Sequence, residues 1–420
     1  MPPRILLADA DAFFVAVARL CDPQGAGRAP LLIVGGSATQ RGVVCSASYE
    51  ARRFGVRAAM PMAQAVRLCP QAMVVPVPRA ACVDKSRQIA AVLRQFAPVL
   101  EAASIDEWYL DLSRTERLYG NEPLAATARR IREAVHKETR LSVSLGGGSN
   151  KLIAKLAVEL AKRPPPPAEP GAFVVEPGDE AAFMTRFRLA DLPLVGPRLQ
   201  ERLASVGLRT VAEALRYDEA ALVGLLGEHT GRWLHGRLRG ECADPVAPRE
   251  RSLSHGREET FPTDLHSDDE LGAELRLLLA EVCRELRRHG QRARTVTVKV
   301  KDADFTQRQR GRTLPCPVES ERALGPIAEA LLHELREARR VGVRLLGVSL
   351  SGLVEAGEEA EPATGGTGEQ LALFASAPAP AAAPAPPVES ERDRAVSRLR
   401  DRVQARFGSA ALRGGGEPSR

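Results

Sequence analysis

A run of four prolines divides this chain more firmly than any other feature of its sequence. Arg163 is followed by Pro164 to Pro167, directly after a segment, 150–161, that has the pattern of a helix. Proline lacks the backbone N–H group that a helix needs, and its ring clashes with the preceding turn, so the helix must end at this run. We therefore predict a domain boundary there.

The residues before the prolines alternate between short apolar runs and helical patterns. The apolar runs predict strands at 4–8, 31–34, 42–47, 103–112 and 141–146. Helices are predicted at 12–20 (capped by Asp11), 48–54, 62–68, 89–96, 124–139 and 150–161. Strands that alternate with helices indicate a mixed α/β core.

The residues after the prolines change character twice. Residues 185–240 have an all-helical pattern with a hairpin at 194–197, Leu-Val-Gly-Pro. From 249 onwards we predict strand 252–261, helix 268–289, strand 295–301, a strand 306–314 that pairs back on it, helix 320–336 and strand 342–352. This βαββαβ order is typical of a compact α+β unit.

The amino-acid composition changes sharply after Leu353. Residues 378–387 are almost entirely Ala and Pro, which cannot bury enough surface to offset the entropy of ordering. We therefore predict a disordered tail over 355–420. Two islands interrupt it: 370–374, which reads QLALF, and an Arg-rich amphipathic stretch, 393–407.

Composition and charge limit the class of protein. No run of about 18 apolar residues exists, the first residues do not resemble a signal peptide, and the seven cysteines form no CxxC pair, so we expect a cytoplasmic protein without a membrane span, a zinc site or disulfides. The net charge is +6 with a pI of about 9.1. Residues 355–420 hold 8 Arg against 10 Asp and Glu, which leaves +8 for the folded part. That charge favours a polyanionic partner such as nucleic acid, although an Arg-rich composition alone would also explain it.

Three carboxylates lie at positions where an uncompensated charge would be energetically unfavourable. Asp9 closes an apolar run, and the pair Asp106-Glu107 interrupts another. Charges within a strand need compensation, and Mg²⁺ supplies it because it prefers carboxylate and phosphate oxygens. Two such ions about 4 Å apart activate a hydroxyl and stabilise a leaving phosphate. The alternative is that the pair lies on an exposed strand edge.

At these motifs the chain resembles Y-family DNA polymerases of the DinB or polymerase IV type. Residues 9–14 match the pattern Asp-x-Asp-x-Phe-Phe, and 104–111 match Ser-x-Asp-Glu-x-Tyr-Leu-Asp. The resemblance implies two Mg²⁺ ions held by Asp9, Asp106, Glu107 and the backbone carbonyl of Ala10. It implies structural roles for Asp11, as a helix cap, and for Asp111, within a strand. Phe14 matches the ring that excludes a 2′-hydroxyl from the nucleotide; the alternative is a core phenylalanine like Phe13.

Two further segments resemble nucleotide-binding parts of the family. Residues 44–59 match its fingers segment, which implies that Ser46, Tyr49 and Arg52 hold the incoming triphosphate. An arginine offers a fork of donors to phosphate oxygens, although Arg52 could also be simply solvated. Residues 146–157 resemble a later palm motif, in which Lys155 best matches a lysine that contacts the triphosphate. Lys151 lies one turn earlier on the same helical face.

The resemblance also implies contacts to DNA. Residues 189–215 resemble a helix-hairpin-helix thumb, in which Gly196 keeps one of two usual glycines and Leu194 replaces the other. Residues 250–353 resemble the family's little finger, in which Arg251 and strand 296–301, including Lys299, would line the duplex with three further arginines, Arg308, Arg310 and Arg312. Such contacts to phosphates carry no sequence information. The alternative is a solvated polar sheet face.

The implied architecture is a right-hand polymerase with a disordered tail. Palm (1–20 and 78–165), small fingers (21–77), thumb (166–245) and little finger (246–354) precede it. Within the tail, 370–374 resembles the peptide by which bacterial polymerases dock on the sliding clamp, through Gln370, Leu371, Leu373 and Phe374.

The implied function is low-fidelity translesion DNA synthesis. A monomer would add dNTPs to the 3′ end of primer–template DNA, without proofreading, because no exonuclease segment is present. One alternative is a catalytically inactive relative that serves as a clamp-bound scaffold for DNA repair. Another is a structural DNA-binding protein that uses the helical hairpin alone.

Overall fold

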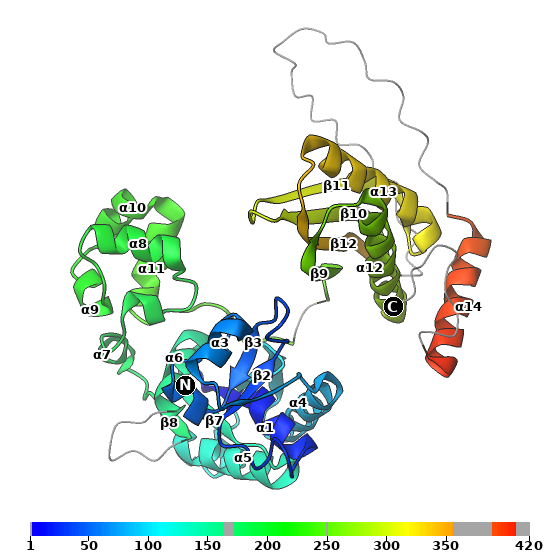
Figure 1. The fold of residues 1–420 in the computed structure, drawn as a ribbon. Helices are drawn as coiled ribbons and strands as arrows, with labels where there is room; N and C mark the ends of the chain where they lie inside the picture. The colour runs from blue at the N-terminus through cyan, green and yellow to red at the C-terminus, as the bar shows by residue number, and fades with distance from the viewer. Residues whose placement is uncertain (1, 163–170, 249–250, 356–388, 409–420) are drawn as a thin grey trace. The chain divides into compact units, whose positions relative to one another are not determined.

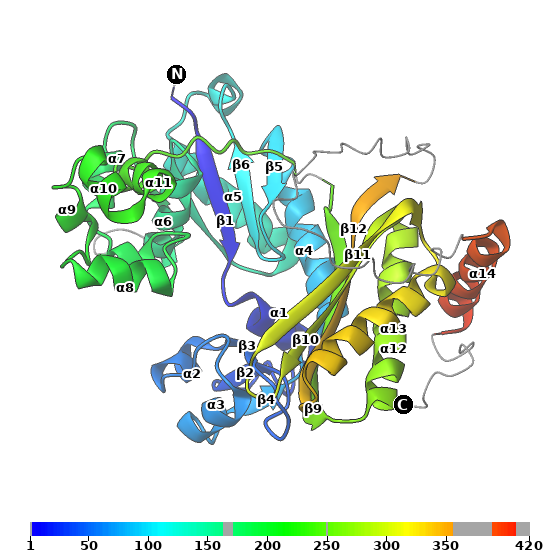
Figure 2. The ribbon, with the colours of Figure 1, turned by 90° about the horizontal axis from the view of Figure 1, so that it is seen from above.

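The computed structural model describes residues 2–162, 171–248, 251–355 and 389–408. The chain forms two compact units, Met1–Glu250 and Arg251–Arg420. Figures 1 and 2 show the ribbon from two directions at a right angle.

A five-stranded sheet in the order β5-β6-β1-β7-β8 organises the first unit. Its strands are β1 (Ile5–Ala10), β5 (Val99–Ala102), β6 (Glu107–Asp111), β7 (Val143–Gly148) and β8 (Ala172–Val174). The central strand β1 pairs antiparallel with β6 and with β7, and all its residues are buried. Figure 2 shows β1, β6 and β5 side by side.

Alternation along β1 sends its side chains to two different sets of helices. Leu6 and Ala8 pack with helices α1 (Phe13–Cys21), α4 (Arg79–Leu93) and α5 (Leu124–Thr139). Ile5 and Leu7 pack on the opposite face against α6 (Lys151–Lys162). Because successive side chains of a strand point to opposite faces, Asp9 shares the face that α6 covers.

Helix α6 approaches β7 closely because β7 ends in glycines. A Cβ atom at Gly146 would lie 2.1 Å from the backbone nitrogen of Val158 and 2.2 Å from the carbonyl oxygen of Ala154. Only a residue without a side chain fits between the strand and the helix. This close packing positions the lysines of α6 against the sheet.

A smaller sheet and a group of helices complete the first unit. The sheet has the order β3-β2-β4, with strands β2 (Leu32–Gly35), β3 (Val44–Ala47) and β4 (Met73–Val75). Two helices pack against it, α2 (Tyr49–Arg53) and α3 (Met62–Leu68). The helical part contains α7 (Glu180–Met184), the short 3₁₀ helix η2 (Leu189–Asp191), α8 (Pro197–Ser205), α9 (Val211–Ala214), α10 (Glu219–Leu226) and α11 (Glu228–Leu238). Another 3₁₀ helix, η1 (Glu116–Tyr119), precedes α5. The core of the helical part includes Leu152, Ile153 and Leu156 of α6, so this helix is shared by both parts.

The second unit is a four-stranded antiparallel sheet in the order β11-β10-β12-β9. Its elements follow one another as β9 (Ser254–Leu265), α12 (Asp268–Arg288), β10 (Gln291–Asp302), β11 (Gln307–Val318), α13 (Glu321–Ala338) and β12 (Val343–Glu355). The buried valines of β10 face the apolar sides of α12 and α13, which together form the core. Figures 1 and 2 show both helices on the same face of the sheet.

The predicted fold class is confirmed, with differences in detail. The mixed α/β core and the βαββαβ unit are present, including the pairing of β11 on β10. The strand predicted at 103–112 is wrong in its first part, because β6 begins at Glu107 and Asp106 precedes it. The helix predicted at 89–96 begins earlier, at Arg79. Strands β4, β5 and β8, of three or four residues each, were not predicted.

Three further expectations need correction. Asp11 does not cap α1: the N-cap is Ala12, no side chain caps it, and Asp11 accepts a hydrogen bond from Ser144 Oγ at 2.8 Å. Strand β8 follows the proline run and still pairs with β7, so the large sheet extends beyond the boundary predicted at 165. In the segment expected to be a disordered tail, residues Glu391–Phe407 form helix α14.

Candidate active site

Strands β1 and β6 bring the three predicted acids together. Asp9 is paired directly with Glu107 across the antiparallel ladder. The ladder continues one step further, where the backbone N–H of Ala10 donates to the carbonyl oxygen of Asp106 at 2.9 Å. Paired residues of neighbouring strands have Cβ atoms about 4.5–5.5 Å apart, so the carboxylates of Asp9 and Glu107 lie close on one face.

Each of these two carboxylates is paired with a lysine of α6. Lys162 Nζ lies 2.8 Å from Oδ2 of Asp9, and Lys155 Nζ lies 2.5 Å from Oε1 of Glu107. The lysines are seven residues apart, which is two helical turns, so they share one face of α6. The carboxylate of Asp106 instead accepts a hydrogen bond from Ser104 Oγ at 2.5 Å.

Burial perturbs the protonation of the central acid. Asp9 is 5% exposed, and its burial raises the pKa to about 7, although Lys162 acts in the opposite direction and Glu107 adds to the rise. Burial would lower the pKa of Lys162, but Asp9 and Glu159 outweigh it, and the net shift is upward. The lysine therefore stays charged, while the buried carboxylate needs positive charge nearby in order to ionise at neutral pH.

The carboxylate and carbonyl oxygens of this site are suitable ligands for a divalent ion, but the side chains are not arranged to coordinate one. Among the residues that the structure describes, no three His, Cys, Asp or Glu side chains make a group that could hold a metal ion. Asp9 and Glu107 turn their oxygens to ammonium groups instead. Carboxylates and a backbone carbonyl are nevertheless the ligands that Mg²⁺ prefers, so the residues present fit the ion once the lysines move away.

The acids open into a cavity of about 1130 Å³. Asp9, Asp106 and Glu107 line one side of it. The rest of the wall comes from Ala10, Ala12, Phe13, Phe14, Cys45, Ser46, Ala47, Tyr49, Arg52, Arg53, Arg57, Ala58, Glu159 and Lys162. The large sheet and the small sheet with α2 therefore share one cavity, acidic at one end and rich in arginine at the other.

Four predicted nucleotide contacts line this cavity. Arg52 is anchored by its Nε, which donates to the carbonyl oxygen of Ala47 at 2.9 Å, and its guanidinium carbon lies 5.0 Å from the centre of the Tyr49 ring. Burial raises the pKa of Tyr49, so its hydroxyl remains a donor at neutral pH. Ser46 is buried. Phe14 is half-buried and meets the buried ring of Phe13 edge-on at 5.5 Å, so the two adjacent rings differ in exposure.

The structure separates the three lysines of α6. Lys151 bonds to both carboxylate oxygens of Glu101, at 2.7 and 2.8 Å, and does not line the cavity. Lys155, the predicted triphosphate contact, is paired with Glu107 and also does not line it, whereas Lys162 does. Sequence reasoning missed Lys162, Arg53 and Arg57. Of these three residues, Lys162 could have been identified from its seven-residue spacing from Lys155.

The thumb hairpin shows why a glycine is usual at position 194. Leu194 has φ 70°, a left-handed conformation that costs an L-residue about 1–2 kcal/mol, and its side chain is 80% exposed. Gly196 is the extended N-cap of α8, and a Cβ atom there would meet nothing within 4 Å. The hairpin thus keeps its turn with a strained leucine.

The register of the second unit separates the predicted DNA contacts. Lys299 lies on the sheet face away from the helices, since its neighbours Val298 and Val300 are buried in the core. Arg310 is paired with Val298 and is therefore on the helix-covered side of the edge strand. Arg312 is on the same side and bonds to Glu334 of α13 at 3.0 Å.

The other predicted arginines also have partners within the unit. Arg308 bonds to Asp302 and to the carbonyl oxygen of Leu335. Arg251 is exposed and 3.2 Å from Glu355. Lys299 and the arginines of β11 therefore do not form one surface.

Two expectations concern the rest of the chain. The predicted clamp peptide, 370–374, lies outside the described residues. No helix in the described ranges has both the length and the apolar character to cross a membrane.

Known proteins resemble this chain over most of its length. The sequence matches the impB/mucB/samB family over residues 8–159 and the C-terminal domain of that family over 252–363. It is 34% identical to a DNA polymerase IV of Desulfatibacillum aliphaticivorans, over 97% of this chain and 95% of the relative. It is 39% identical to that of Halorhodospira halophila, over 83% and 95%. A solved Y-family DNA polymerase chimera of Dbh and Dpo4 aligns with a TM-score of 0.74 and 26% identity, covering 84% of this chain and 99% of the chimera.

Proposed function

The chain belongs to the impB/mucB/samB family and is a Y-family, DNA-directed DNA polymerase of the polymerase IV type, and we propose that it performs low-fidelity translesion synthesis by two-metal nucleotidyl transfer. One observation carries the proposal. Asp9 and Glu107 face each other across two strands, beside Asp106, at the acidic end of a large cavity.

The acidic end of the cavity would hold the metal ions. Asp9, Asp106, Glu107 and the carbonyl of Ala10 would bind two Mg²⁺ ions, whose chemistry is to activate the primer 3′-hydroxyl and to neutralise charge on the leaving pyrophosphate. Lys155 and Lys162 would then give up their carboxylate partners. Lys162 already lines the cavity, which makes it a better candidate than Lys155 for the triphosphate.

The opposite end of the cavity would hold the nucleotide. Arg52, pinned through its Nε, would present its remaining N–H groups to phosphate oxygens, with Ser46 and Tyr49 as neutral donors. The ring of Phe14 would lie against the sugar and exclude a 2′-hydroxyl. The side chains of this set would bind phosphate and sugar, so base pairing would be checked by cavity shape.

The size of the cavity supports tolerance of damaged templates. About 1130 Å³ exceeds the roughly 300–1,000 Å³ usual for a small-molecule site, which leaves room for a template base as well as a nucleotide. A roomy site discriminates weakly between correct and altered pairs, because a small misfit costs little there. We therefore propose error-prone copying past altered bases, without proofreading.

Primer–template DNA and the sliding clamp are the proposed macromolecular partners. Lys299 on the open sheet face, Arg251 and the thumb hairpin at Gly196 would contact phosphates, while Arg310 and Arg312 are weaker candidates because of their side of the sheet. Residues 370–374 would dock on the clamp. We place the enzyme in the cytoplasm as a monomer.

A primer-extension assay across one abasic or alkylated template base tests the proposal. Wild type should extend past the lesion with Mg²⁺ and dNTPs, clamp should increase extension, and Asp106→Ala should abolish it. Inactivity of wild type as well as Asp106→Ala would favour the scaffold role instead. Magnesium-dependent incorporation would in turn exclude a purely structural DNA-binding protein.

A further inference from the structure

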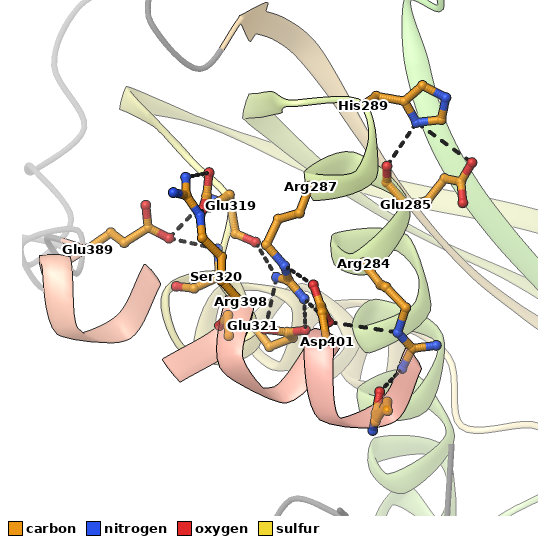
Figure 3. Close-up of polar contacts among 12 residues, drawn as sticks. Arg284, Glu285, Arg287, His289, Glu319, Ser320, Glu321, Glu389, Arg398 and Asp401 are labelled. Carbon is orange, nitrogen blue, oxygen red and sulfur yellow. Dashed lines mark hydrogen bonds and ion pairs between the residues drawn. The ribbon is translucent and has the colours of Figure 1, made fainter. Parts of the chain in front are cut away.

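Helix α14 returns to the second unit and binds it with its polar face. Its inward positions 397, 401 and 404 are Ser, Asp and Gln, spaced as one helical face. Ser397 Oγ donates to Glu321, Asp401 accepts from Arg287, and Gln404 accepts from Arg284 at 2.6 Å. Figure 3 shows Asp401 of α14 beside Arg287 of α12 and Glu321 of α13.

Further polar contacts join α14 and the residues just before it to the second unit. Arg398 Nε donates to Glu319 at 2.8 Å, and the Glu319 side chain is 2% exposed. The carboxylate of Glu389 accepts the backbone N–H groups of Glu319 and Ser320, at 3.0 and 2.6 Å. Arg287, 4% exposed, is held between Glu321 and Asp401. Buried ionic networks add little net stability, whereas they can fix one arrangement among several, so this network would set the rotation of α14 about its axis.

That rotation leaves an apolar stripe facing outward. Val396, Leu399, Val403 and Phe407 follow one another at i, i+3, i+7 and i+11, which is one face of a helix. Val396 is 58%, Leu399 53% and Phe407 66% exposed, and Val403 is half-buried. A surface helix normally buries its apolar side and exposes its polar side. Here the arrangement is reversed, and the fold of the unit gives no reason for it.

The surroundings of the stripe indicate the kind of occupant. Exposed arginines flank it at 392, 402 and 406, and the guanidinium carbon of Arg406 lies 5.4 Å from the centre of the Phe407 ring. A second copy of the stripe would bring arginines against arginines. The open face of the sheet is the one that α12 and α13 do not cover. DNA bound there would not reach α14, because both helices and the sheet lie between them (Figure 2).

We propose that α14 is a docking helix for a partner protein, which receives Val396, Leu399, Val403 and Phe407 in an apolar groove with an acidic rim. Helices that bind in this way use anchors at this spacing. The charge complement comes from the arginines beside the stripe. The ionic network holds the helix ready in its bound orientation, and binding would leave the open face of the sheet accessible.

Photo-crosslinking from α14 in the full-length protein, expressed in its own cells, tests the proposal. Benzoyl-phenylalanine at Leu399 labels the stripe, and at the exposed position Ala405, on another side of the same helix, it is the matched control. We expect one protein to be labelled from 399 and not from 405, through a peptide that contains apolar and acidic residues. Labelling of a second copy, of nucleic acid or of lipid, or no labelling above the control, would overturn the proposal.

Binding of the purified acceptor protein to the full chain then separates the stripe from the docked face. Leu399→Glu should weaken binding at least tenfold, and Arg402→Glu several-fold with a smaller salt dependence. Leu399→Glu should leave hydrogen exchange in α14 and primer extension unchanged, whereas Arg398→Met should accelerate exchange in α14. Equal binding of wild type and Leu399→Glu, or faster exchange in the latter, would refute the assignment.

Discussion

Replacing Gly146 with alanine tests whether the contact between β7 and α6 positions the active site. The new Cβ atom would lie 2.1 Å from Val158 N and 2.2 Å from Ala154 O, both backbone atoms of the helix. Neither can rotate away, so the helix must move by more than 1 Å to reach ordinary contact. Forced overpacking of this kind costs about 1–3 kcal/mol, and the backbone nature of the clash places it at the upper end.

The expected loss of stability is measurable by thermal unfolding. In a unit of this size each kcal/mol lowers the melting temperature by roughly 2–4 °C, so Gly146→Ala should melt about 5–10 °C below wild type. Primer extension at a permissive temperature should also fall, because α6 carries Lys155 and Lys162 to the acids. Calorimetry and extension assays on the same preparations would measure both.

Two other glycines are matched controls. A Cβ atom at the neighbouring Gly147 would meet Leu6 Cδ2 at 2.8 Å and Val174 Cγ2 at 2.9 Å, which are side-chain atoms that can adjust, so Gly147→Ala should cost less. At Gly224 in α10 nothing lies within 4 Å, and alanine should stabilise by about 1 kcal/mol through helix propensity. A melting temperature for Gly146→Ala within 1 °C of wild type, or equal to that of Gly147→Ala, would refute the reasoning.

Three further predictions concern the cavity. Lys162→Met should raise the KM for dNTP about tenfold, because one charge-assisted contact to the triphosphate is lost. Lys155→Met should raise the KM less. If steady-state kinetics rank the two variants in the opposite order, Lys155 is the triphosphate contact. The pKa of Asp9 is raised to about 7 by burial, with Lys162 lowering it only in part, so a proton competes with metal below that pH. Affinity for Mn²⁺, measured by calorimetry, should therefore fall by up to about tenfold from pH 8 to pH 6, and pH-independent binding would contradict the shift. Phe14→Ala should permit incorporation of ribonucleotides, detected on denaturing gels, and unchanged selectivity would mean that Phe14 serves only the core.

The sequence predicted the acids and the fold class because both have local patterns. Asp9 and the pair at 106–107 stand beside apolar runs, and the runs give the strands their burial. Position 106 shows the limit of this approach, since an apolar run continues through it while β6 begins one residue later. The strand order, and hence the direct pairing of Asp9 with Glu107, depends on long-range pairing that periodicity does not contain.

Residues defined by a face rather than a motif were harder to predict. Lys162 reaches Asp9 only because Gly146 lets α6 lie close to the sheet. Arg310 and Lys299 seemed equivalent as basic residues of neighbouring strands, but the register assigns them to opposite faces. The Arg-rich stretch near the end could be identified as amphipathic, whereas the outward orientation of its apolar side depends on partners such as Glu319 and Arg287, which are far away in sequence.

The central claim is that Asp9, Asp106 and Glu107 together hold two divalent ions beside a nucleotide. Electron paramagnetic resonance can count Mn²⁺ bound to the full-length chain with primer–template DNA and a non-hydrolysable dNTP. We predict two ions per chain for wild type, and fewer for Asp9→Asn and for Asp106→Asn. Wild type that binds none, or variants that bind as many ions as wild type, would contradict the account.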